Sequence, residues 1–219
     1  ILPVYKKYNN TAYYVSISDA DRSSDLDYIK TIHHGIDLQQ FDFQPTPDDT
    51  LLFFGRIHHD KGAREAIEIA RACNKKLVMA GIVQDHAYYD QYVAPHLDND
   101  LVVYVGSVGP VERNRLLGKA CALLHPIQFD EPFGLSIVES LACGTPVIAF
   151  DRGSMPELIE NGQNGFLVSN VNEAVEAVAR IKAIDRAACR RHVERRFTVE
   201  RMIDEYINVY EMILKDRSV

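Results

Sequence analysis

Two glutamates and a pair of cations are the side chains of this sequence whose types and spacing best suit chemistry. Glu131 and Glu139 are separated by seven residues that include a Pro-Phe-Gly segment. Arg56 and Lys61 lie five positions apart in a loop bracketed by two glycines. Carboxylates accept hydrogen bonds from hydroxyl groups, and a guanidinium beside an ammonium can clamp a diphosphate. Taken singly, these residues would read as a loop acid, an exposed helical Glu and a solvated basic loop.

The elements around the two glutamates would place them on either side of a helix start. The apolar run at 122–126 predicts a buried strand that Pro126 ends, and residues 134–142 predict a helix. The first helical amides would point unpaired into the crevice beyond the strand, where the helix dipole favours phosphate. Glu139 would lie about 7.5 Å along the helix from Gly134, about the distance from a nucleotide's pyrophosphate to its ribose. The residues expected to bind substrate here are Phe133, Gly134, Leu135, Ser136 and Glu139.

The cation loop differs from the common nucleotide motifs. Residues 54–62 read Phe-Gly-Arg-Ile-His-His-Asp-Lys-Gly and match neither GxxxxGK[ST] nor GxGxxG. This counts against ATP hydrolysis and ordinary NAD binding. A Rossmann dehydrogenase remains an alternative that NAD binding would reveal.

The segment from Glu131 to Glu139, followed by Ser-Leu-Ala-Cys-Gly-Thr-Pro-Val-Ile-Ala, resembles the donor-site signature of retaining glycosyltransferases of family 4. That family has the GT-B fold, in which two Rossmann-like domains face each other across a cleft. The resemblance covers about residues 28–214. The loop at 55–62 is similar to the family's Gly-Arg…Lys-Gly loop, which binds the donor diphosphate.

Two positions depart from the family's usual pattern. Residues 151–157 resemble its Gly-Gly-x-Pro-Glu turn, but Ser154 stands where a second glycine is common. His34 replaces the Asn of a motif like Asn-Gly-Val-Asp. Any contact made by that Asn side chain is therefore open here.

The resemblance implies transfer of a sugar from a nucleoside-diphosphate sugar, of the UDP-glucose or GDP-mannose type, to an unidentified acceptor. The expected catalytic residues are Arg56 and Lys61, which would stabilise charge on the leaving phosphate, and Glu131, which would hold sugar hydroxyls. Further donor contacts are expected from Gly55, Gly106 and Ser107. No metal and no cofactor is expected. The alternatives are a non-catalytic nucleotide-sugar-binding module and a GT-B epimerase or phosphorylase relative.

Apolar periodicity predicts an α/β fold, Rossmann-like and three-layered (α/β/α), with a mostly parallel sheet. Strands are predicted at 11–18, 28–32, 51–54, 76–80, 101–105, 122–125, 147–150 and 166–168. Helices are predicted at 62–73, 86–97, 111–120, 134–143, 155–160, 172–182 and through 183–219, with a turn at 23–26. The expected domains are 1–45, the end of an N-terminal domain with its linker; 46–197, the nucleotide-sugar-binding domain; and 198–219, a helix packing back toward the N-terminal domain.

Composition sets the outer limits. The 219 residues carry a net charge of −7, with 47% apolar and 25% charged residues, as in an ordinary soluble globule. The acidic balance argues against nucleic acid as a partner, and no apolar run or leader indicates a transmembrane segment or export. Four cysteines without ligand spacing suggest reduced core residues and a cytoplasmic location.

The chain opens at Ile1 without Met, which looks like a segment of something longer. We therefore expect an N-terminal GT-B domain in the full-length protein, and a fragment that binds a donor without efficient turnover. The apolar stripe of the terminal helix would then be exposed, or covered in a homodimer.

Several polar patterns have plainer interpretations. Asp-x-Asp pairs at 19–21, 25–27 and 98–100 match the metal spacing of GT-A glycosyltransferases, but three in an acidic chain suggest chance. The pairs His33-His34 and His58-His59 are expected to point to opposite faces of an extended chain, without carboxylate or Cys at ligand spacing. Arg152 and Glu157 would form a loop ion pair. The arginines within 186–196 are expected to form a solvated basic face.

Overall fold

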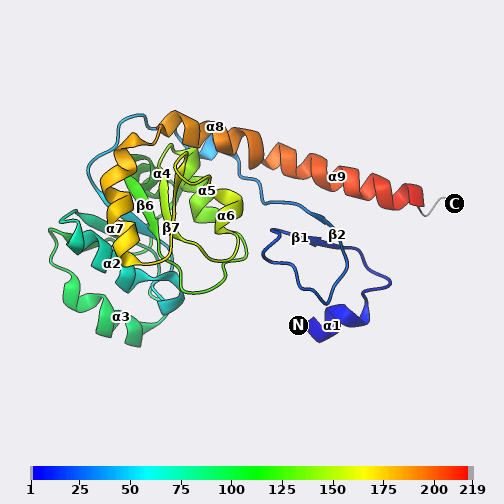
Figure 1. Cartoon of the computed structure of the whole chain (residues 1–219), viewed down its shortest axis with the longest axis horizontal. Coiled ribbons are helices and arrows are strands. Elements are labelled where there is room, and N and C mark those ends of the chain that lie inside the picture. The colour runs from blue at the N-terminus through cyan, green and yellow to red at the C-terminus, as the bar shows by residue number, and fades with distance from the viewer. Residues whose placement is uncertain (1, 217–219) are drawn as a thin grey trace.

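A computed structural model describes residues 2–216, and its centre is a six-stranded sheet (Figure 1). The strands are β3 (Leu51–Phe54), β4 (Leu77–Ala80), β5 (Val102–Tyr104), β6 (Ala122–His125), β7 (Val147–Phe150) and β8 (Gly165–Val168). Their order in the sheet is β5-β4-β3-β6-β7-β8, and all five pairings are parallel. The predicted α/β class with a mostly parallel sheet is confirmed.

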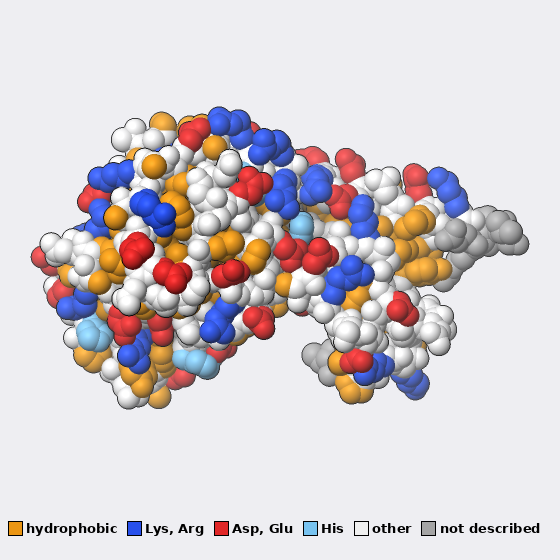
Figure 2. All heavy atoms as spheres, in the orientation of Figure 1, with side chains coloured by type: hydrophobic (Ala, Val, Ile, Leu, Met, Phe, Trp, Pro, Cys, Tyr) orange, Lys and Arg blue, Asp and Glu red, His pale blue; other side chains and the backbone are white. Residues whose placement is uncertain are grey.

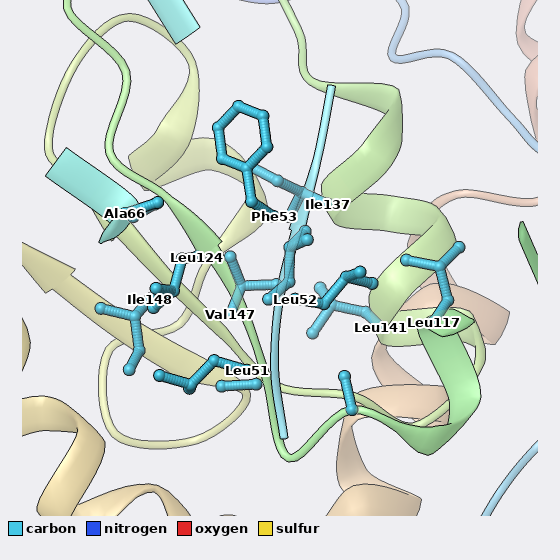
Figure 3. Close-up of a cluster of buried hydrophobic side chains, with 14 of the residues drawn as sticks. Leu51, Leu52, Phe53, Ala66, Leu117, Leu124, Ile137, Leu141, Val147 and Ile148 are labelled. Carbon is cyan, nitrogen blue, oxygen red and sulfur yellow. The ribbon is translucent and has the colours of Figure 1, made fainter. Parts of the chain in front are cut away.

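These strands form because they are short continuous apolar runs, the pattern of strands buried on both faces. Every residue of β6 and β7 is buried. Leu52 of β3 lies in register with Leu123 of β6. Figure 3 shows the central side chains between Ala66 on one side and Ile137 on the other.

Helices cover both faces of the sheet. The helices of the body are α2 (Ala63–Ala72), α3 (His86–Tyr92), α4 (Pro110–Lys119), α5 (Leu135–Ala142), α6 (Met155–Leu158), α7 (Val171–Arg180) and α8 (Arg186–Arg196). The last helix, α9 (Val199–Asp216), projects away from the sheet (Figure 1). Helices α2 and α7 pack together on one face, and α4 and α8 pack around α5 on the other. This is the expected three-layer α/β/α arrangement.

Two predicted helices are interrupted in the structure. The helix predicted at 86–97 ends at Tyr92, and a 3₁₀ turn at Ala94–His96 contains Pro95, which has no amide hydrogen to continue the helix. The long helical stretch predicted at 183–219 is broken between α8 and α9 at Phe197 and Thr198.

The N-terminal residues form a small unit of their own. Strand β1 (Tyr14–Ser16) pairs in parallel with β2 (Tyr28–Thr31) in a separate two-stranded sheet. The strand predicted at 11–18 is thus only three residues long. Helix α1 (Leu2–Lys7) precedes it and was not predicted, since its short apolar start carries no capping signal.

The N-terminal unit joins the body beside the start of α9. The Ile36 amide donates to Phe197 O at 2.9 Å, and the Val199 amide donates to Ile36 O at 3.2 Å. A Cβ added to Gly35 would lie 2.2 Å from Thr198 O, so only glycine permits this approach. The two segments 35–36 and 197–199, where the chain crosses between the N-terminal unit and the body, are therefore hydrogen-bonded to each other. Helix α9 extends from the body beyond these crossings (Figure 1).

The prediction of a solvated basic face on α8 is wrong for two of its arginines. Arg186 is 9% exposed, and its guanidinium donates to the carbonyls of Gln44, Gly118 and Ala120 and to the Thr145 hydroxyl. Arg190 donates to Phe41 O at 2.7 Å and Ala142 O at 2.9 Å. The guanidinium carries five donors in a fixed fork, so it can satisfy several helix-end and loop carbonyls at once.

The cysteines behave as predicted. Cys121, Cys143 and Cys189 are buried, Cys73 is half-buried, and all four are free thiols. Burial raises the pKa of the Cys143 and Cys189 thiols to about 12. Within residues 2–216, no helix has the length and apolarity that crossing a bilayer requires.

Candidate functional site

The strand order reverses between β3 and β6, and a cavity lies at the carboxyl end of these two strands. In open parallel sheets this switch point is where ligands bind. The cavity has a volume of about 350 Å³. It is lined by Ile17, His34, Phe53, Phe54, Gly55, Arg56, Lys61, His125, Glu131, Pro132, Phe133, Gly134, Leu135 and Ser136. Eight of the eleven site residues predicted from the sequence are in that set.

A tight turn after β3 brings Lys61 into the cavity. Residues His59–Lys61 form a 3₁₀ turn that ends at Gly62, whose φ is +73°. A Cβ at Gly62 would lie 1.9 Å from Pro126 O, so glycine allows the turn to rest directly on the end of β6. The Lys61 ammonium pairs with the Glu131 carboxylate and lies 4.8 Å from the ring centroid of Phe129.

Arg56 occupies the other side of the same loop. Its side chain is exposed and its guanidinium donates to the Gln84 amide oxygen. Among the described residues no carboxylate pairs with it in a salt bridge. Arg56 is therefore able to turn toward an anion in the cavity at little electrostatic cost.

The start of α5 is open toward the cavity. Gly134 precedes the helix with a φ of +99°, and no side chain caps the first amides. The loop before it is pinned by buried Ser154, whose hydroxyl lies 2.9 Å from Glu131 O and 2.6 Å from Phe133 O. An uncapped helix start held in place beside two cations is a ready site for phosphate.

His125 is a site residue that the sequence analysis missed, because it was considered only as the end of a strand. It is 5% exposed, and its Nε2 lies 3.9 Å from the Glu131 carboxylate without a hydrogen-bond partner. Burial, aided by the nearby Lys61 ammonium, lowers the pKa of His125 to about 3. A polar residue ending an otherwise apolar strand, at the carboxyl edge of the sheet, is the signal that could have found it.

The N-terminal unit also reaches the site. The Ser18 hydroxyl donates to Pro132 O at 2.6 Å. The Glu157 carboxylate accepts bonds from the amides of Asp19 and Ala20, both at 2.9 Å, and lies 2.8 Å from His33 Nε2. The plainer interpretation of Arg152 and Glu157 as a loop ion pair is therefore wrong, since Glu157 ties the N-terminal unit to α6 instead.

His33 and His34 do not point to opposite faces as predicted. Their rings lie 5.9 Å and 5.1 Å from the ring of Phe133. His34 also lines the cavity, and burial lowers its pKa against a smaller raising effect of Asp21. The residue in place of the family's usual Asn thus reaches the site.

Three predicted site residues lie outside the cavity lining: Gly106, Ser107 and Glu139. Gly106 follows β5 at the edge of the sheet, where its carbonyl accepts from the Gly81 amide at 2.9 Å. Glu139 pairs with Arg113 of α4 at 3.0 Å, and its pKa is raised by burial despite that cation. Arg113 was not predicted, because its contact with Glu139 joins two helices that the sequence does not place together.

The acidic pairs of the sequence have structural partners. One Asp98 carboxylate oxygen accepts the amides of Asp100, Leu101 and Val102. In residues 2–216, none of the three Asp-x-Asp pairs belongs to a group of three potential metal ligands. The expected lack of a carboxylate at ligand spacing from His58 and His59 is wrong, because Asp60 lies with them in such a group.

Basic and acidic side chains are interspersed on the surface rather than clustered by sign. On the face shown in Figure 2, basic and acidic side chains alternate over the body. A second cavity, of about 610 Å³, lies at the opposite end of the strands beside Cys121 and Pro146. It contains none of the predicted site residues.

Comparison with known proteins identifies relatives. A family model described as "Glycosyl transferases group 1" matches residues 37–195. The glycogen synthase of Mycobacterium tuberculosis is 30% identical over 146 residues, which are 63% of this chain and 35% of that protein. The chain spans about half the length of other curated relatives, 46% of one and 55% of another.

Two solved structures share the fold. AviGT4, a glycosyltransferase involved in avilamycin A biosynthesis, aligns with a TM-score of 0.78 and 26% identity, over 92% of this chain and 64% of that one. HepE from Anabaena, solved in complex with UDP and glucose, aligns with a TM-score of 0.82 and 19% identity, over 96% of this chain and 66% of that one.

Proposed function

Because the chain belongs to the group 1 glycosyl transferases, we propose that it is the donor-binding part of a retaining, metal-independent glycosyltransferase of family 4. The proposed donor is a nucleoside-diphosphate sugar of the UDP-glucose or GDP-mannose type. The observation that carries this proposal is the cavity at the switch point, where Arg56, Lys61, Glu131 and the uncapped start of α5 meet. The glycogen synthase and the UDP complex of HepE among the similar proteins support it.

The contacts of Lys61 suggest how a donor would be received. Without a ligand, the Lys61 ammonium is held by Glu131. A diphosphate at the start of α5 would compete for that ammonium with more negative charge than one carboxylate carries. Glu131 would then be released to accept hydrogen bonds from the sugar hydroxyls, with neutral His125 beside it.

In the proposed reaction, the bond between the anomeric carbon and the diphosphate breaks through an oxocarbenium-like state. The acceptor hydroxyl attacks from the same face and gives its proton to the leaving phosphate. Negative charge grows on the leaving phosphate, so cations already in position stabilise the transition state most. Arg56, Lys61 and the amides at the start of α5 would supply that stabilisation. The Glu139 carboxylate would accept hydrogen bonds from the ribose hydroxyls. Arg113, which pairs with Glu139, would then also contact the nucleotide.

We propose the domain division 1–45, 46–197 and 198–219 stated above, with base contacts near Gly106 and Ser107. The acceptor would be bound by an N-terminal domain facing the cavity in a longer protein, which the greater length of the relatives supports. The exposed apolar residues of α9, Ile203, Ile207, Tyr210 and Met212, are the proposed contact for a homodimer.

Calorimetry without added metal tests the donor site. UDP-glucose, GDP-mannose, UDP, GDP and NAD would be titrated into the chain and into its Arg56→Ala/Lys61→Ala variant. The proposal expects one nucleotide and its sugar conjugate to bind, and the variant to lose about 10- to 100-fold or more in affinity for both. Lys76→Ala, an exposed lysine at the opposite end of β4, is the matched control. Equal binding by the double variant, or binding of NAD alone, would refute the proposal.

A further inference from the structure

Three consecutive residues beside the donor cavity form a cluster that the proposed function does not use. One imidazole nitrogen each from His58 and His59 and a carboxylate oxygen of Asp60 all lie within 4.8 Å of one another. The Asp60 carboxylate joins the two rings: His58 Nδ1 lies 3.4 Å from one oxygen, and His59 Nε2 lies 2.8 Å from the other. None of the three residues lines the cavity, whereas the next residue, Lys61, does.

These separations fit the donor set of a divalent transition metal. Zinc binds imidazole nitrogen and carboxylate oxygen at about 2.0–2.2 Å, so neighbouring ligands of a tetrahedral site lie about 3.3 Å apart. The two separations from Asp60 fall on either side of that value, and they run to different oxygens of the carboxylate, so each oxygen faces one imidazole. Imidazole with carboxylate is a ligand set suited to zinc, copper and nickel rather than to magnesium or calcium.

The backbone holds this cluster in place. The residues belong to the 3₁₀ turn that Gly62 ends, and the Gln128 amide donates to Asp60 O at 2.7 Å. Two contacts compete with a metal: His58 Nδ1 accepts from the Asp60 amide at 3.2 Å, and His59 Nε2 lies 2.8 Å from an Asp60 carboxylate oxygen. A bound ion would have to displace both.

The cluster is also open to solvent. The His59 side chain is 64% exposed, so an ion can enter and keep water in its remaining coordination positions.

We propose that His58, His59 and Asp60 bind one first-row divalent transition-metal ion, with Zn²⁺ as the first candidate, on the outer flank of the loop that carries Lys61. The site is separate from the donor cavity and takes no part in sugar transfer. It departs from the expectation of no metal, which for the His58-His59 pair rested on opposite faces of an extended chain and on the lack of a carboxylate or Cys at ligand spacing.

Calorimetry with ZnCl₂ on the untagged chain, together with the visible absorption of added Co²⁺, tests this site. We expect one ion per chain, with affinity at least about tenfold lower in His59→Ala and in Asp60→Asn, since even indirect partners of metal ligands contribute that much. His86→Ala, at an exposed histidine of α3, should bind the ion as the unaltered chain does.

Thermal unfolding of each variant would show that it is folded, independently of any nucleotide binding. Zinc binding that survives both substitutions, or that falls equally in His86→Ala, would overturn the proposal. A thiolate-to-cobalt absorption band would also overturn it, because the ion would then be on a cysteine.

Discussion

Lys61 and Glu131 form an ion pair across 70 residues of sequence, and their side chains are only 15% and 14% exposed. The pair joins the turn after β3 to the loop before α5, the two segments that border the cavity. The Lys61 ammonium and the Glu131 carboxylate therefore neutralise each other in this structure.

Replacing one member of this pair should destabilise the ligand-free protein. Lys61→Met leaves the Glu131 carboxylate half-buried without its cation, and should lower the free energy of unfolding by about 1–3 kcal/mol. Lys61→Met/Glu131→Gln should recover part of that loss, because no charge is then left unpaired. Urea unfolding of both variants, with Lys76→Met as control, measures the coupling. Strictly additive losses would show that the two side chains do not interact.

Glu131→Gln separates binding of the sugar from binding of the nucleotide. The variant should bind the nucleoside diphosphate at least as tightly as the unaltered chain, because Lys61 no longer has a competing carboxylate. The extra affinity for the sugar conjugate should fall by about 10-fold or more, as expected when hydrogen bonds to a charged group are lost. Calorimetry gives the ratio of the two dissociation constants. Asp130→Asn, at the exposed neighbouring position, should leave that ratio unchanged.

His125 should make stability depend on pH. Its pKa is about 3 in the folded protein and about 6.5 in an unfolded chain, so the unfolded state binds the proton between these values. The stabilisation is complete above about pH 6.5 and is lost as the pH falls toward 3. From pH 7 to pH 5 this histidine alone should remove about 2 kcal/mol.

Urea unfolding at the two pH values tests this expectation. His125→Gln should show a loss smaller by about that amount, whereas His86→Gln, at an exposed position, should behave as the unaltered chain does. Buried His192, whose pKa is also lowered by burial, contributes to the pH dependence of the unaltered chain and of His125→Gln alike. An unchanged pH dependence in His125→Gln would contradict a neutral His125.

Ser154→Ala should loosen the loop that carries Glu131. The substitution removes the hydroxyl that bonds Glu131 O and Phe133 O, in a fully buried position, and should cost about 1–2 kcal/mol of stability. Affinity for the sugar conjugate should fall as well, because Glu131 is less firmly placed. Ser169→Ala, at an exposed serine, is the control for thermal unfolding and calorimetry. Undiminished sugar-conjugate affinity would mean that the loop holds its form without Ser154.

The apolar face of α9 predicts self-association. Ile203 and Ile207 are 48% and 47% exposed, so a second copy of the chain would bury both. Light scattering during size-exclusion chromatography should show a concentration-dependent dimer that Ile203→Lys/Ile207→Lys abolishes. A monomer at all concentrations would exclude this contact.

The central strands were predictable from the sequence because strands buried on both faces consist of consecutive apolar residues. Runs such as Leu51–Phe54 and Val147–Phe150 are apolar throughout and are bounded by turn residues. The loop that follows Leu51–Phe54 carries Arg56 and Lys61, so the edge of the sheet that holds the site could be assigned before its strand order was known. The order itself, which puts β3 beside β6, required tertiary structure.

Contacts between distant elements were not predictable. Arg186 is buried because its guanidinium bonds carbonyls of distant segments, such as Gln44 O and Gly118 O. The residues next to Arg186 in the sequence do not indicate these contacts. Arg113 reaches Glu139 only because α4 and α5 pack together. The conformation of the His58-His59 pair depended on a left-handed residue at Gly62, which turned an expected extended segment into a 3₁₀ turn.

The bonded crossings at Ile36 and Thr198 limit how the N-terminal unit can move. Because these two segments are hydrogen-bonded side by side, a bend in one requires a bend in the other. Any swing of the unit away from the sheet must break the Ser18 bond to Pro132 and the Glu157 bonds together. Movement of the unit away from the cavity should therefore be a single cooperative step about one axis.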